Sequence, residues 1–123
     1  METRIVQVRK ILDKLADDNG GFPFHGGKGR FWNLPRDEFI AGPIYEETPI
    51  VPGDKTSFLW RILAGPATGT KGDEFARMPP GGPYINAPDL DFITQWVADG
   101  APDADPAFMS AFSRHAGLGR RRQ

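Results

Sequence analysis

The segment Arg77-Met78-Pro79-Pro80-Gly81-Gly82 constrains the fold of this chain more than any other. Its two prolines hold the backbone extended and its two glycines permit a tight turn, so Met78 is displayed on a rigid loop. A helix is predicted directly after the loop, from Asn86. A thioether fixed in front of a packed helix is suited to binding a soft ligand, and His25 is the best upstream partner for it.

Helical spacing of apolar residues predicts four to five short helices, separated by long loops rich in glycine and proline. The first begins after a cap at Thr3 and ends near Asp18. The others are predicted at 35–42, from 54 or 56 to 64, from 86 to the stop at Gly100, and from 105 onward. Trp96 lies on the apolar face of the helix that begins at 86, so it is expected in the core.

The predicted fold class is therefore all-α, because no internal repeat and no strand pattern is present. Residues 65–77 are glycine-rich and polar without periodicity, so we expect a mobile loop there. Residues 1–104 are predicted to form one domain. Residues 105–123 are predicted to add a C-terminal helix and a basic tail.

Composition and motifs exclude several classes of function. The formal charge of −1 gives no general attraction to nucleic acid or to an anionic membrane. The absence of cysteine excludes disulfides, thiolate metal sites and thioether-linked cofactors. No catalytic triad, paired-carboxylate site, phosphate-binding loop or zinc spacing is found, so we expect no enzymatic activity of the chain's own.

The first seven residues lack the apolar segment of a signal peptide. No run approaches the ~20 apolar residues that a membrane-spanning helix needs. The sequence therefore predicts a cytoplasmic protein without membrane contact.

Three segments in the same order resemble the cytochrome c family, in the form common in bacterial multi-domain enzymes and planctomycete proteins. Ile50–Leu59 resembles that family's V-P-G-D-x-x-x-S-x-L helix start, and Arg77–Gly82 resembles its axial-methionine loop. Leu90–Pro102 resembles its last core helix. The likeness covers roughly residues 4–102 and implies a cytochrome c-like fold.

The chain departs from this family at the haem-attachment motif. The family attaches haem through Cys-x-x-Cys-His after its first helix, and here Gly21-Phe22-Pro23-Phe24-His25 stands in that place. Both cysteines are absent and the histidine is present. Covalent attachment of haem through thioether bonds is therefore chemically impossible.

The hypothesis favoured by the sequence is a haem-free accessory or interaction subunit of a larger redox enzyme, with no cofactor of its own. Since protein interiors leave little empty volume, Phe22 and Phe24 are expected to fill the former haem space. We expect the two rings to turn toward one apolar face of the helix that follows Asn86, which carries Leu90, Ile93 and Trp96. Trp32 is expected to be exposed and to contact the partner protein.

Two alternatives remain open at this point. The first is an electron-transfer protein that binds haem non-covalently, with His25 and Met78 as the axial ligands that the resemblance implies. The second is a copper site, because imidazole and thioether suit Cu(I). Without the resemblance, a histidine after a helix is usually a surface residue, and a methionine before two prolines is usually a packed core residue.

Overall fold

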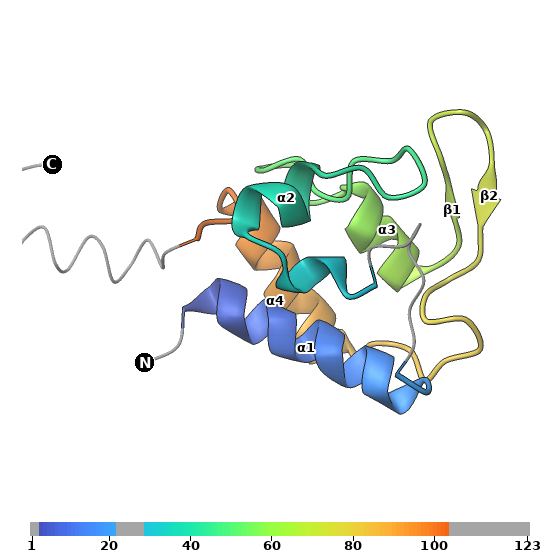
Figure 1. Ribbon diagram of the computed structural model, residues 1–123, viewed down its shortest axis with the longest axis horizontal. Coiled ribbons are helices and arrows are strands. Elements are labelled where there is room, and N and C mark those ends of the chain that lie inside the picture. Colours follow the sequence, from blue (N-terminus) through green and yellow to red (C-terminus); the bar gives the residue numbers. More distant parts are fainter. Residues whose placement is uncertain (1–2, 22–28, 104–123) are drawn as a thin grey trace, which may run out of the picture.

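A computed structural model describes residues 3–21 and 29–103 (Figure 1). Helix α1, Arg4–Asp18, begins after Thr3 as predicted, but the Thr3 side chain makes no capping hydrogen bond. The helix ends at Asn19, whose backbone N–H donates to the carbonyls of the last turn. Gly20 and Gly21 then take φ angles of +105° and +84°, which favour glycine. The buried stripe of α1 has helical spacing and consists of Ile5, Val8, Leu12 and Ala16.

Three further α-helices in the described residues lie close to where the sequence placed them. They are α2, Arg36–Ala41, α3, Phe58–Ala64, and α4, Ala87–Ala98. A short 3₁₀ helix, η2, Phe31–Asn33, precedes α2. The Asn86 side chain accepts a 2.8 Å hydrogen bond from the Asp89 N–H, which is the predicted cap of α4.

Helix α3 begins later than the sequence predicted. Asp54 Oδ1 accepts hydrogen bonds from both the N–H and the hydroxyl of Thr56, so this carboxylate closes a local turn. The Ser57 hydroxyl also turns back to the preceding segment and donates to the Asp54 carbonyl. The polar side chains that were read as helix caps are therefore used in the turn that precedes the helix.

The all-α prediction is wrong, because the segment expected as an aperiodic loop contains an antiparallel pair of strands. Strands β1, Ala67–Thr68, and β2, Glu74–Phe75, pair Ala67 with Phe75 and Thr68 with Glu74. Each strand has two residues, which is too short to show an alternating pattern. The described residues therefore form a mixed fold, with a small hairpin beyond α3 (Figure 1).

Completely buried core side chains come from α1, α2 and α4, and include Val8, Phe39, Ile93 and Trp96. Trp96 is fully buried and stacks on Phe39, with ring centroids 5.8 Å apart. Its indole N–H donates to the Pro102 carbonyl at 3.0 Å, so the chain after α4 folds back onto the helix. The sequence prediction that Trp96 is a core residue is confirmed.

Two remaining predictions concern the C-terminal segment and a membrane-spanning helix. The expected C-terminal helix and basic tail lie outside the described residues, and the division at residue 104 stays a prediction. Within residues 3–21 and 29–103, no helix combines the length and the apolar composition needed to cross a bilayer.

Candidate functional site: an apolar cavity

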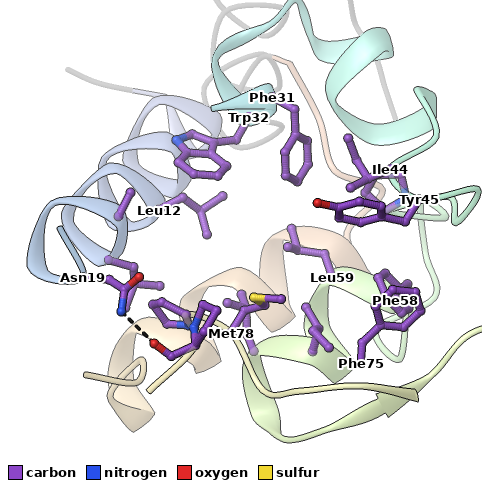
Figure 2. Close-up of a pocket in the computed structure, with 17 residues that line it drawn as sticks. Leu12, Asn19, Phe31, Trp32, Ile44, Tyr45, Phe58, Leu59, Phe75 and Met78 are labelled. Atoms are coloured by element: carbon purple, nitrogen blue, oxygen red, sulfur yellow. Dashed lines mark hydrogen bonds between the residues drawn. The ribbon is translucent and has the colours of Figure 1, made fainter. Parts of the chain in front are cut away.

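An apolar cavity of about 350 Å³ lies between α1, η2, α3 and two loops (Figure 2). This volume is within the range of small-molecule sites. No described residue in its wall carries a charge. Aliphatic, aromatic and proline side chains make up nearly all of the lining, which consists of Leu12, Leu15, Ala16, Asn19, Phe31, Trp32, Ile44, Tyr45, Pro49, Phe58, Leu59, Ile62, Leu63, Phe75, Met78, Pro79 and Pro80.

Met78 lies in this wall, and Figure 2 shows its sulfur atom on the cavity side. Its backbone N–H donates to the Ile62 carbonyl at 3.0 Å, which ties the loop to α3. From the other side, Asn19 Nδ2 donates to the carbonyls of Pro80 and Gly82 at 2.9 and 2.8 Å. The methionine loop is therefore fixed to two helices, while a role for Met78 as an iron ligand stays a prediction.

Trp32 is a buried part of the cavity wall, with 5% of its surface exposed. Its indole N–H donates to Asp13 Oδ1 on α1 at 2.8 Å, and its ring meets Phe31 edge-on. The expectation that Trp32 is an exposed residue is wrong, because α1 supplies a hydrogen-bond acceptor that draws the indole inward.

Asp13 holds η2 against α1 through a single carboxylate oxygen. Besides Trp32, this oxygen accepts from Arg30 at 3.2 Å and from Asn33 at 3.0 Å. Burial alone would raise the pKa of Asp13, but the hydrogen bonds from Trp32, Asn33 and Arg30 outweigh it and leave the pKa below its ordinary value. The ionised carboxylate is therefore the form that positions this wall of the cavity.

The turn from Ile44 to Glu47 supplies another part of the wall and was not recognised in the sequence. Ile44 and Glu47 exchange two backbone hydrogen bonds of 2.9 Å, and Tyr45 and Glu46 between them have φ angles of +50° and +68°. This is a two-residue turn of the kind that usually contains Asn-Gly. No glycine or asparagine marks it, so turn residues gave no signal.

Glu47 connects this turn to the hairpin. Its side chain is buried, with 4% of the residue exposed, and Oε2 accepts from the N–H and the hydroxyl of Thr70 at 2.9 and 3.0 Å. A Cβ atom on Gly69 would lie 2.6 Å from Oε2, so only glycine leaves room for the carboxylate. The rings of Phe75, in β2, and Tyr45, in the turn, lie side by side with centroids 6.2 Å apart.

Three of the predicted site residues cannot be placed. Phe22, Phe24 and His25 lie outside the described residues, so the filling role of the two rings and the ligand role of the histidine stay predictions. The wall of the cavity does not include Leu90, Ile93 or Trp96, which were the expected contacts of the two rings. The last two are fully buried in the packed core.

The copper hypothesis also stays a prediction. No group of three or more histidine, cysteine, aspartate or glutamate side chains with metal-binding geometry occurs in the described part of the chain. Both histidines of the sequence lie outside that part.

No family model, curated protein or solved structure matches the chain. The likeness to the cytochrome c family therefore stays a prediction from three sequence segments. Function is inferred below from the cavity and the residues that form it.

Proposed function

We propose that this chain binds a flat, largely apolar ligand non-covalently in the cavity between α1, η2 and α3. The observation that carries the proposal is a wall of aromatic and aliphatic side chains around about 350 Å³ of space. Covering apolar surface that borders water is favourable, and a concave apolar wall buries most of the surface of a ligand that fits it. An apolar space of this size is therefore suited to a largely apolar ligand.

Haem is the ligand that the sequence resemblance implies, and the described wall suits it in three respects. The aromatic rings and aliphatic side chains of the wall suit contact with a porphyrin face, and the Met78 thioether is a known kind of axial ligand. Since no described wall residue is charged, the two carboxylates of haem would lie in solvent. Bound haem would supply one-electron redox chemistry, which agrees with a redox enzyme as the proposed partner.

Titration of haemin, followed by visible absorption, tests this assignment. We expect saturable one-to-one uptake by the parent chain. Because axial ligation and apolar burial must supply all of the affinity, His25→Ala should abolish or greatly weaken uptake. Met78→Leu should retain uptake but leave five-coordinate haem with an altered reduction potential.

The control is the stability of the two variants without haemin. Met78→Leu nearly conserves volume and should cost less than about 1.5 kcal/mol of unfolding free energy. Identical, non-saturating titrations for all three proteins would contradict haem binding. That result would favour the haem-free accessory subunit, whose partner would then be sought by co-purification.

A further inference from the structure

Tyr45 is held at the edge of the cavity in a backbone conformation that its side chain disfavours. Its φ of +50° and the +68° of Glu46 lie in the left-handed region, where residues with a Cβ are strained. The turn is closed by the two backbone hydrogen bonds between Ile44 and Glu47, so neither residue can relax alone. Backbone strain that the surrounding structure maintains is concentrated at functional sites, so the strained turn suggests a functional role for Tyr45.

The phenol of Tyr45 has no hydrogen-bond partner among residues 3–21 and 29–103. Its ring lines the cavity, although 49% of the residue is exposed. Figure 2 shows the phenol oxygen at the end of the ring that faces the cavity. A polar group at the edge of an apolar site fixes the orientation of a ligand, and this hydroxyl is placed to donate to one.

The charges around the turn restrict what that hydroxyl can bind. Glu46 and the buried Glu47 follow Tyr45 directly, and the nearby cation Lys71 is paired with Glu46 at 2.7 Å. A carboxylate at the phenol would add a negative charge beside a turn that carries two glutamates and one paired lysine, and no described wall residue is positive. A carbonyl oxygen accepts the same hydrogen bond without that repulsion.

We propose that Tyr45 is the specificity-determining residue of the cavity. Its phenol donates to an uncharged carbonyl oxygen on the edge of a flat aromatic ligand, as found in aromatic ketones and quinones. This inference rests on the proposed function, because it requires that the cavity takes a flat ligand. It requires neither iron nor the Met78 thioether.

Three pyrene derivatives followed by fluorescence test the inference: 1-acetylpyrene carries a neutral carbonyl, 1-ethylpyrene has nearly the same shape without it, and 1-pyrenecarboxylate carries a charge. The parent chain should bind acetylpyrene more tightly than the carboxylate. Tyr45→Phe removes only the hydroxyl, so it should weaken acetylpyrene binding about fivefold and leave ethylpyrene binding unchanged.

Tyr84→Phe is the matched control, because Tyr84 is similarly exposed at 44% and lies against Arg77 rather than in the cavity wall. It should change the affinity for none of the three probes. Equal affinity of the parent and Tyr45→Phe for acetylpyrene would overturn the role of the phenol. Tighter binding of the carboxylate than of acetylpyrene would overturn the preference for a neutral acceptor.

The two proposals fail in different ways. Saturable ethylpyrene binding with no effect of Tyr45→Phe on acetylpyrene would leave the proposed cavity function in place and remove the inference. A parent chain that takes up none of the three probes would overturn both.

Discussion

Two halves of the described part of this molecule are built from the same kinds of side chain, yet in one the side chains pack together and in the other they border an open cavity. In the packed half, Val8 of α1, Phe39 of α2 and Trp96 of α4 are completely buried. In the cavity half, Phe31 and Leu59 are also buried, with 4% and 7% exposed, but they border about 350 Å³ of open volume. Apolar composition alone therefore does not decide whether a region closes on itself.

The difference lies in what holds the backbone. The packed half consists mainly of helices whose apolar stripes can approach until they touch. The wall of the cavity combines α1 and α3 with loops and short elements that polar contacts fix in place, such as Asn19 on the methionine loop, Asp13 on Trp32 and Glu47 on Thr70. These contacts hold the walls in place, so the apolar side chains between them cannot collapse together.

The largest effect is expected when a tryptophan is removed from each half. Trp96→Ala should lower the unfolding free energy by roughly 3–5 kcal/mol, because the ring is packed on all sides. Trp32→Ala should cost less, because its ring already borders the cavity and fewer packing contacts are lost. Urea denaturation of both variants measures the difference. Equal losses would show that the wall at Trp32 is as closely packed as the core.

Enlarging a side chain should have opposite consequences in the two halves. Val8→Leu, at a completely buried position, should cost about 1–3 kcal/mol through overpacking. Ala16→Leu, on the same helix but in the cavity wall, should be tolerated although it adds more atoms. Thermal unfolding of the two variants provides the comparison. A larger loss for Ala16→Leu would show that the cavity has no room for a side chain.

The packed half was more predictable from the sequence than the cavity half. The stripe of α1, the Asn86 cap of α4 and the burial of Trp96 all follow from helical spacing and capping residues. These signals are local, so a single sequence carries them. The same local rules misplaced the start of α3, where Asp54 serves a turn instead of a cap.

The cavity half depends on contacts between residues far apart in the chain, which no local pattern reveals. Strands of two residues gave no alternation, and the turn at Tyr45 lacks the glycine that would mark it. The burial of Trp32 depends on Asp13, nineteen positions earlier. The sequence did identify Met78 as a displayed residue, since prolines and glycines are local signals too.

A smaller effect is expected from the charge that positions Trp32. The lowered pKa of Asp13 means that its stabilisation is present above the ordinary aspartate value of 3.8 and is lost as the pH falls through the lowered pKa. Asp13→Asn should cost about 1 kcal/mol at pH 7, a modest loss because the side chain is 35% exposed.

Urea denaturation tests this pH dependence. The midpoints of the parent and of Asp13→Asn are compared at pH 7 and at about pH 2.5, close to the lowest practical pH. The gap between the two proteins should narrow at the acid pH, because the unfolded parent chain takes up a proton at residue 13 below pH 3.8, which removes part of the stabilisation by the ionised carboxylate. Asp91→Asn, on the exposed surface of α4, is the control at pH 7. A gap that is the same at both pH values would contradict a stabilising role of the ionised carboxylate.

The smallest effect should come from relieving the backbone strain in the turn beside Tyr45. The informative result is whether the change raises or lowers the unfolding free energy. Glu46→Gly removes a Cβ from a residue with φ of +68° and also removes the exposed ion pair with Lys71. Because left-handed backbone costs about 1–2 kcal/mol and an exposed ion pair contributes less, we expect a net gain of about 0.5 kcal/mol. Glu38→Gly, at an exposed position of α2, should instead lose roughly 0.5–1 kcal/mol, since glycine disfavours a helix. Thermal unfolding of the pair gives both signs, and a loss at Glu46 as large as at Glu38 would show that the cavity half stores no strain in this turn.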